Sequence, residues 1–456
     1  MPRPPGQAFC WWWCCCSTTT SDDVSTSFLP NATGSVVPLP PAPLDSVTHT
    51  PAHAIMRRDD FEFLAVLGRG TYGKVLQVRK RGSNALYAMK VMRKADVIAR
   101  NQVRHTLTER TLLETMRHPF IVTLHYAFQS DSTLFLVMAL QSGGELFFHL
   151  RREGAFSEPR VRLYAAEILL ALDALHRACF VYRDLKPENV LLDGEGHVRL
   201  SDFGLAKQIE GALDAGGSTF CGTPSYMAPE VLLGTGHGIA VDWWSFGTLI
   251  YETLAGAPPF YSRNLHEMYR KILCGDLRWP PSMSKAARGL LERLLVRDPL
   301  RRLGARGAAQ IQQQRFFKPL EFRRVLARDY KPIFQPTLVG ASPSVQALDT
   351  TNFDSSFTGE VVCEVDLLAP LHAPSTGGGG THSAAGQQAG SGQEDGGGAA
   401  AALADSSDRA VTVEQAPATT FRQPEDDAGD EPVKEAPWDA WRDFAIGYTH
   451  SPTSHW

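Results

Sequence analysis

The hydrophobic pattern changes along the chain from strand-like runs to helical spacing. Apolar-rich runs with strand chemistry occur at Phe61–Leu67, Leu86–Met92 and Leu134–Met138. After Pro159 the apolar residues recur with a period of about 3.6, which places them on one face of a helix. These residues are Val161, Tyr164, Ala165, Ile168, Leu169, Leu172 and Leu175. A second buried helix is predicted over Asp242–Leu254.

The order of these elements predicts an α+β fold, in which a small sheet-rich lobe precedes a larger helical lobe. Ser157 is the predicted N-cap of the helix that follows Pro159. The ordered pattern begins near Phe61 and weakens past Phe317. Residues 1–60 are predicted to be a disordered leader, because a Ser/Thr/Pro-rich composition cannot build a packed core alone. Residues 371–436 hold Gly, Ala, Ser and Gln runs, which predict a flexible low-complexity linker.

Composition excludes several classes of protein. Of the 456 residues 43% are hydrophobic, which is enough for a sizeable core. The 45 basic and 49 acidic side chains give a net charge of −4, which excludes the cationic surface of a nucleic-acid-binding domain. No apolar run reaches the length of about 18 residues that predicts a membrane span. The eight cysteines form no disulfide framework, so a reducing cytoplasmic or nuclear compartment is predicted.

A cluster of aromatic and sulfur side chains, Trp11–Trp13 and Cys14–Cys16, lies near the start of the chain. Acylation of more than one of these cysteines would give a reversible membrane anchor, and membrane contact is expected only in that case. The alternatives are a disordered leader, or translation that starts at Met56. An intact-mass measurement on the native protein separates these interpretations.

A G-x-G-x-x-G loop, Gly68–Gly73, lies between two predicted strands. Its glycines let backbone N–H groups approach phosphate oxygens without a Cβ in the way. A dinucleotide-binding fold needs a helix next and an acidic residue about 20 positions on, but here a strand follows and Lys90 stands at that distance. Lys90 could hold phosphates if Glu109, on a helical stretch over Arg104–Met116, fixes its ammonium. The alternative is a salt bridge at the surface.

Three further motifs indicate which interpretation of the glycine-rich loop and Lys90 is correct. Tyr182–Asn189 reads Tyr-Arg-Asp-Leu-Lys-Pro-Glu-Asn and resembles the catalytic loop H-R-D-x-x-x-x-N of protein kinases, with Tyr in place of His. Asp202-Phe203-Gly204 follows it, and then Ala228-Pro229-Glu230. Each tripeptide is common by chance, but all five motifs in this order and spacing are not. The sequence is therefore similar to a protein kinase.

Within the protein kinases, the sequence resembles the AGC group of serine/threonine kinases. The resemblance rests on Tyr-Arg-Asp in the catalytic loop, on Gly143–Leu150 and on Ser218–Pro224. It implies a bilobal α+β protein kinase fold, with a small β-rich N-lobe, a large helical C-lobe and an AGC C-terminal tail. Residues 61–317 would then form the protein kinase domain, and residues 318–370 the tail that wraps the small lobe. Residues 437–456 would form an aromatic terminus similar to the hydrophobic motif of that group.

The resemblance also implies an ATP:protein phosphotransferase that uses ATP and Mg²⁺. Asp184 would orient the substrate hydroxyl and accept its proton, and Lys186 would steady the γ-phosphate. Lys90, held by Glu109, would bind the α- and β-phosphates. Oxygen ligands suit Mg²⁺, a hard ion. The implied Mg²⁺ ligands are Asn189 and Asp202.

A nucleotide site and its supports follow from the same resemblance. Met138 would be the gatekeeper, and Asp242 would anchor the catalytic loop from below. Arg302 would pair with Glu230. Backbone groups of the two residues Ala139 and Gln141 would bind adenine, and Glu145 would meet the ribose. The implied nucleotide-contacting residues are Gly68, Gly70, Gly73, Val75, Lys90, Ala139, Gln141 and Glu145.

Regulation and substrate choice are implied as well. Thr219 would be the activation-loop phosphosite, and its phosphate would lie among Arg183, His105 and Lys207. An upstream phosphoinositide-dependent kinase is the expected activator. Thr223 would favour serine and threonine over tyrosine. Three acidic side chains would bind arginines upstream of the phosphoacceptor, so protein substrates with upstream arginine are expected. These side chains are Glu145, Glu188 and Glu252.

The tail motif Thr351–Thr358 is similar to that of ribosomal protein S6 kinases and protein kinase C. Because only about 60 residues precede the kinase region, the single-domain, p70-type S6 kinase branch is predicted. Val365 and Ala445 stand where that group carries tail phosphosites, and Ser225 replaces the usual glutamate. The chain is expected to be a monomer. Two alternatives are another AGC subfamily and a kinase-fold scaffold without significant transfer.

Overall fold

The computed structural model describes residues 56–70, 73–209, 220–340, 348–360 and 362. All of these residues belong to one compact unit, His53–Trp456. The described chain begins at Met56, and the 3₁₀ helix Arg58–Asp60 precedes the first strand. Several predictions concern residues outside this part of the chain, namely those for Cys14–Cys16, Thr219, Val365, Ala445 and the segments 371–436 and 437–456.

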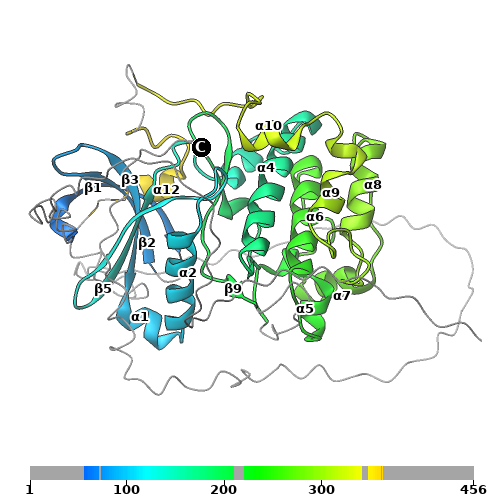
Figure 1. The fold of residues 1–456 in the computed structure, drawn as a ribbon, viewed down its shortest axis with the longest axis horizontal. Coiled ribbons are helices and arrows are strands. Elements are labelled where there is room, and N and C mark those ends of the chain that lie inside the picture. Colours follow the sequence, from blue (N-terminus) through cyan, green and yellow to red (C-terminus); the bar gives the residue numbers. More distant parts are fainter. Residues whose placement is uncertain (1–55, 71–72, 210–219, 341–347, 361, 363–456) are drawn as a thin grey trace, which may run out of the picture. The chain divides into compact units, whose positions relative to one another are not determined.

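The small lobe is built on a five-stranded antiparallel sheet with the order β1-β2-β3-β5-β4 (Figure 1). The strands are β1 (Phe61–Gly70), β2 (Gly73–Lys80), β3 (Leu86–Arg93), β4 (Leu124–Gln129) and β5 (Thr133–Ala139). β1, β3 and β5 confirm the strands predicted from the hydrophobic runs, whereas β2 and β4 have no predicted counterpart. The sheet buries an apolar cluster in which the ring of Phe128 stacks on those of Phe61 and Phe135.

Two helices follow β3 and cover the sheet. They are α1 (Lys94–Ala99) and α2 (Val103–Thr115). α2 confirms the predicted helical stretch around Glu109. Its buried residues include Leu112 and Leu113, which join the main core, and the charged Glu109. A carboxylate buried in this way must meet a positive partner, because burying an unpaired charge is costly.

The larger lobe is helical (Figure 1). Its helices are α3 (Leu146–Glu153), α4 (Glu158–Arg177), α5 (Pro229–Leu233), α6 (Ala240–Ala255), α7 (Leu265–Cys274), α8 (Lys285–Leu294), α9 (Ala309–Gln312) and α10 (Phe322–Leu326). α4 and α6 confirm the two predicted helices, and the apolar face predicted for α4 is buried. The α+β prediction is therefore confirmed. Ser157 is the N-cap residue of α4, but its side chain makes no capping hydrogen bond.

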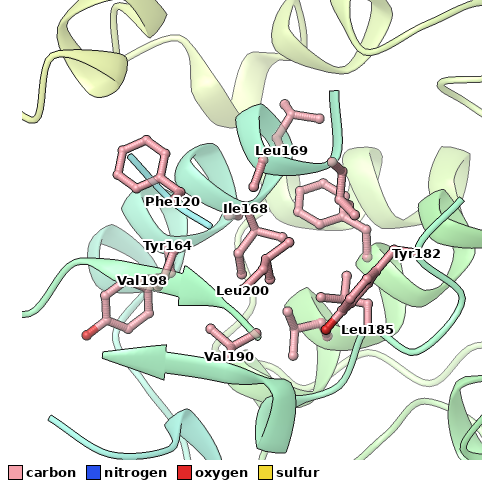
Figure 2. Close-up of a cluster of buried hydrophobic side chains, with 14 of the residues drawn as sticks. Phe120, Tyr164, Ile168, Leu169, Tyr182, Leu185, Val190, Val198 and Leu200 are labelled. Carbon is pink, nitrogen blue, oxygen red and sulfur yellow. The ribbon is translucent and has the colours of Figure 1, made fainter. Parts of the chain in front are cut away.

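Two short antiparallel strand pairs in the larger lobe flank two loops with polar motifs. β6 (Phe180–Val181) pairs with β9 (Lys207–Gln208), and β7 (Val190–Leu192) pairs with β8 (Val198–Leu200). The loop 182–189 joins β6 to β7, and the loop 201–206 joins β8 to β9. Buried side chains of these loops and strands join side chains of α4 in one apolar cluster (Figure 2). α4 contributes Ile168 and Leu169, and the loop and strand residues are Tyr182, Leu185, Val190, Val198 and Leu200.

The chain beyond the 3₁₀ helix Arg315–Phe317 remains attached to the rest of the molecule. The ring of Phe334 lies 3.9 Å from the guanidinium carbon of Arg160, a cation–π contact with the larger lobe. Asn352 donates to the carbonyl of Ser142 at 3.2 Å. α12 (Ser355–Thr358) packs against β1 (Figure 1). The described tail therefore contacts both lobes. Among the described helices, none combines the length and apolarity of a membrane span.

Candidate active site

The ammonium of Lys90 meets two carboxylates that come from distant parts of the chain. Its Nζ lies 2.7 Å and 3.0 Å from the two oxygens of Glu109 and 3.0 Å from Oδ1 of Asp202. Lys90 belongs to β3, Glu109 to α2 and Asp202 to the loop after β8. The side chains of Lys90 and Glu109 are only 15% and 4% exposed, which excludes the alternative of a surface salt bridge.

These contacts shift the pKa values of all three groups. Burial disfavours the ammonium of Lys90, but the carboxylates of Asp202 and Glu109 outweigh it and raise the pKa of Lys90. Lys90 in turn lowers the pKa of Asp202. Burial raises the pKa of Glu109 despite its bond to Lys90. Lys90 therefore remains a cation beside the ionised, half-exposed carboxylate of Asp202.

Asp184 is the centre of a second polar network, in the loop after β6. Lys186 Nζ donates to its Oδ2 at 2.7 Å, and Asn189 Nδ2 donates to the same oxygen at 2.9 Å. Thr223 Oγ1 donates to its Oδ1 at 3.1 Å. Both carboxylate oxygens are therefore oriented by neighbours, which holds the side chain in one place. The residues expected to act on a substrate hydroxyl are brought together.

Asp242 of α6 supports this loop from below, as expected. Its buried carboxylate accepts hydrogen bonds from the backbone N–H groups of Tyr182 at 2.9 Å and Arg183 at 2.8 Å. His176 Nε2 lies 2.7 Å from it. Arg183 has a φ of 67°, which costs free energy for a residue other than glycine. The bonds to Asp242 hold the backbone in that conformation, directly before Asp184.

The expected pair of Arg302 and Glu230 is also present. The two guanidinium nitrogens of Arg302 lie 2.6 Å and 2.8 Å from the two carboxylate oxygens, a bidentate geometry. Both side chains are buried. Glu230 belongs to the first turn of α5. Removal of one partner would leave a buried charge unpaired, so the pair holds this turn in place.

The glycine-rich loop lies at the turn between β1 and β2. Gly68 and Gly70 belong to the last residues of β1, and Gly73 is the first residue of β2. A Cβ on Gly73 would lie 1.9 Å from the carbonyl oxygen of Val91, so only glycine fits there. Val75 is paired with Lys90 in the sheet, which places the loop next to the Lys90 site.

The segment after β5 carries the backbone groups expected to bind adenine. The Ala139 carbonyl accepts a hydrogen bond from Gln141 Nε2 at 3.1 Å, and its N–H donates to Thr123 at 2.9 Å. A carbonyl has two lone pairs, so Ala139 can accept a further bond. Met138 is partly buried against the main core.

The three acidic side chains expected to bind arginine influence one another electrostatically. Burial, followed by the carboxylates of Glu188 and Asp354, raises the pKa of Glu145 to about 7. Burial and Glu188 likewise raise the pKa of Glu252 to about 6, although its carboxylate accepts a hydrogen bond from the buried Tyr226 hydroxyl. Asp354 and Tyr226 were missed by sequence reasoning, because no motif links them to Glu145 or Glu252.

The protein kinase domain family matches residues 61–317 of the sequence. The chain belongs to the protein kinase family. The matched range holds the glycine-rich loop, the Lys90 site and the network around Asp184. Asp354, whose carboxylate contributes to the raised pKa of Glu145, lies beyond it.

This kinase is similar to several curated proteins along about two thirds of its length. Protein kinase 2 of Dictyostelium discoideum is 52% identical over 303 residues, which cover 66% of this chain and 62% of that protein. Serine/threonine protein kinase ypkA of Aspergillus fumigatus is 51% identical over 307 residues, 67% of this chain and 47% of the other. Serine/threonine-protein kinase gad8 of Schizosaccharomyces pombe is 48% identical over 318 residues, which cover 70% of this chain and 54% of that protein. The kinase thus spans less than two thirds of each of these relatives.

Protein kinases generally use ATP and Mg²⁺, and the donor set of this kinase fits both. The two hydrogen bonds that Asn189 makes to Asp184 use its amide nitrogen, which leaves the amide oxygen for a hard cation. Asp202 is ionised and 51% exposed, so its carboxylate is open to a ligand. Lys90 supplies the positive charge that phosphates need.

Proposed function

We propose that this kinase transfers the γ-phosphate of ATP to serine and threonine residues in arginine-containing sequences. The observation that carries the proposal is the Lys90 site, where one ammonium lies between the buried Glu109 and the open carboxylate of Asp202. The glycine-rich loop adjoins this site through the pairing of Val75 with Lys90, and Ser201, which precedes Asp202, donates its N–H to the carbonyl of Asn189 in the catalytic loop at 3.0 Å. Names of relatives such as ypkA and gad8, both described as serine/threonine protein kinases, support the same class of reaction.

Each side chain of the site has a separate role in phosphate transfer. The hydroxyl oxygen of the substrate attacks the γ-phosphorus, the bond from that phosphorus to the bridging oxygen breaks, and ADP leaves. Asp184 accepts the hydroxyl proton, and Lys186 offsets the charge on the transferred group. Lys90 holds the α- and β-phosphates. Mg²⁺, when bound by Asn189 and Asp202, neutralises phosphate charge.

Substrate choice rests on the acidic side chains Glu145, Glu188 and Glu252. Burial, together with the charge of Glu188, raises the pKa values of Glu145 and Glu252, so an arginine side chain placed among them would stabilise the ionised carboxylates. We infer a preference for arginine three and five residues upstream of the phosphoacceptor. Thr223, bonded to Asp184, lies where it would favour serine and threonine substrates.

Regulation is proposed to act through phosphorylation of Thr219, by an activator similar to phosphoinositide-dependent kinases. The phosphate would order the activation loop through Arg183, whose Nε donates to the Leu205 carbonyl in the loop that follows Asp202. Signalling of the ribosomal S6 kinase type, in the cytoplasm or nucleus, is the branch that the tail motif favours. The names of the relatives reported above do not distinguish the S6 kinase branch from other branches.

Phosphate transfer to an Arg-x-Arg-x-x-Ser peptide tests the proposal. The full chain, Asp184→Asn and Thr219→Ala are compared with Mg·ATP, beside a control peptide in which both arginines are alanine. We expect Asp184→Asn to lower the rate constant by about 10²–10⁴-fold, because it removes the proton acceptor. Thr219→Ala should lower activity sharply, and the control peptide should be a poor substrate.

Each result has a separate meaning. Transfer that is equal for both peptides would contradict the arginine preference and leave the kinase activity standing. ATP binding without transfer, in a chain shown to be phosphorylated on Thr219, would replace the proposal with a kinase-fold scaffold. A protein with equal activity in wild type and Thr219→Ala would contradict the loop regulation alone.

A further inference from the structure

The carboxylate of Glu360, in the tail, lies between two cations of the hairpin that carries the glycine-rich loop. Arg69 Nη2 donates to Oε2 of Glu360 at 2.7 Å, and Lys74 Nζ lies 3.9 Å from the same oxygen. Arg69 and Glu360 are 291 positions apart in the sequence. The Glu360 side chain is 25% exposed, so the group is partly shielded from water.

Arg69 and Lys74 face each other across the two strands. They are paired in the antiparallel register of β1 and β2, one step before Gly70 and Gly73. Like charges directly opposite each other destabilise an antiparallel pair. The repulsion therefore falls at the mouth of the glycine-rich loop. Glu360 supplies the opposite charge at that point.

Glu360 is held in place by a packed element rather than by its charge alone. α12 begins at the N-cap Asp354, whose side chain accepts a hydrogen bond from Ser356 N at 2.9 Å. The helix packs against β1 (Figure 1). Phe357 packs against the apolar cluster of the sheet, and the N–H of Glu360 donates to the Phe357 carbonyl at 3.0 Å. The tail thus places one carboxylate at the phosphate-binding hairpin.

We propose that Glu360 is a positioning residue of the nucleotide site. By pairing with Arg69 and Lys74, it holds the end of the β1–β2 hairpin in the position that receives the nucleotide phosphates. Without this carboxylate the two cations repel each other and the paired ends of β1 and β2 lose their alignment. Nucleotide affinity falls as a result, while the rate of the chemical step at saturating ATP is preserved. This inference rests on the proposed function as an ATP-dependent kinase.

The test measures the Kd of the full chain for a fluorescent ATP analogue with Mg²⁺, together with KM for ATP and kcat. The variants are Glu360→Gln, Arg69→Glu and the charge swap Arg69→Glu/Glu360→Arg. We expect each single variant to weaken binding by about threefold to tenfold, as for a partly shielded ion pair, with kcat within about twofold of wild type. The charge swap restores Kd to within about twofold, because it restores opposite charges.

A matched control comes from the other end of the same hairpin. Glu62 pairs with Arg79 at 2.9 Å across β1 and β2, away from the glycine-rich loop, and its side chain is 44% exposed against 25% for Glu360. Glu62→Gln should leave the Kd unchanged. About 1 M salt should reduce the difference between wild type and Glu360→Gln, because salt screens exposed pairs.

Three results would overturn the inference. Unchanged nucleotide binding by Glu360→Gln would mean that the carboxylate does not contribute to nucleotide affinity. Tighter binding would mean that the carboxylate competes with phosphates for the two cations. Failure of the charge swap to rescue Arg69→Glu would mean that Arg69 acts on the nucleotide directly. Because binding is measured apart from transfer, a chain that binds ATP without transferring phosphate contradicts the proposed function and leaves this test intact.

Discussion

At the scale of single residues, the site combines paired and unpaired charges. Lys90 has carboxylates on two sides, and Asp184 has donors on both oxygens. Glu145 is different, because burial and two neighbouring carboxylates raise its pKa to about 7, against the opposite effect of Lys186. A carboxylate in this state gains from a cation that arrives with the substrate.

Arginine recognition should therefore depend on pH near neutrality. As the pH falls from about 8 to 6, Glu145 takes up a proton and loses its charge, so KM for the Arg-x-Arg-x-x-Ser peptide should rise several-fold. The measurement is KM for that peptide at constant ATP across this range. Glu145→Gln should show a high KM with a smaller pH dependence, because only Glu252, whose pKa is raised to about 6, still titrates in this range. A profile in the variant identical to that of wild type would assign the titration to another group.

Several predicted residues of this site belong to motifs that fix their spacing. Lys90, Asp184 and Asp202 were identified in this way, and the structure brings Lys90 and Asp202 within 3.0 Å of each other. Asp354 and Glu360 could not be identified. Each acts on a partner far away in the chain, and an acidic residue in a polar tail is usually a solvated side chain.

At the scale of elements, the hydrophobic periodicity predicted the helices that have one clear apolar face. α4 has such a face, and it is buried as expected. β2 was not predicted because it has only three apolar residues, Val75, Leu76 and Val78, and two of them are adjacent, so polar and apolar positions do not alternate along the strand. Ser157 is the N-cap residue of α4, as predicted, but its side chain accepts no capping hydrogen bond, and Pro159 in the first turn has no N–H to donate to it.

The contact of the tail with the segment after β5 depends on one glycine. Gly144 has a φ of +70°, and a Cβ there would lie 2.0 Å from the backbone oxygen of Asn352. The left-handed backbone conformation alone costs a residue other than glycine about 1–2 kcal/mol. Gly144→Ala should therefore displace the tail and lower the free energy of unfolding by more than this amount. Denaturant unfolding and the rate of proteolysis within residues 330–360 measure the two effects.

Gly82 provides the control for that experiment. It has a φ of +83°, and a Cβ there would meet no atom within 4 Å. Gly82→Ala therefore has the backbone cost without the clash. If both variants lose the same stability and their tails are cut at the same rate, Gly144 does not hold the tail by close contact.

At the scale of the whole molecule, the proposed nucleotide site would join three parts of the chain. The sheet lobe would supply Lys90, the helical lobe Asp184 and Asp202, and the tail Glu360 as the residue that positions the β1–β2 hairpin. Because no single part would hold a complete site, a nucleotide bound there would bind the folded state and not the unfolded chain. Binding should stabilise the molecule as a whole.

Thermal unfolding measures this stabilisation directly. At a concentration of Mg·ATP about 100 times its Kd, the folded state gains about 2.7 kcal/mol, which raises Tm by several degrees. Lys90→Met should lose most of this shift, because the phosphates lose their buried cation. Its Tm without ligand should also fall, because Glu109 and Asp202 lose their common partner. Chelation of Mg²⁺ should reduce the wild-type shift.

Lys271→Met is the matched control, because Lys271 pairs with Glu267 at 3.0 Å on the surface of α7. It should keep the full shift with Mg·ATP and a nearly unchanged Tm without it, since exposed pairs contribute about 0–1 kcal/mol. An equal shift in Lys90→Met and Lys271→Met would place the phosphates away from Lys90. The lobes would then be joined by the protein contacts alone, and the role given to the Lys90 site would be wrong.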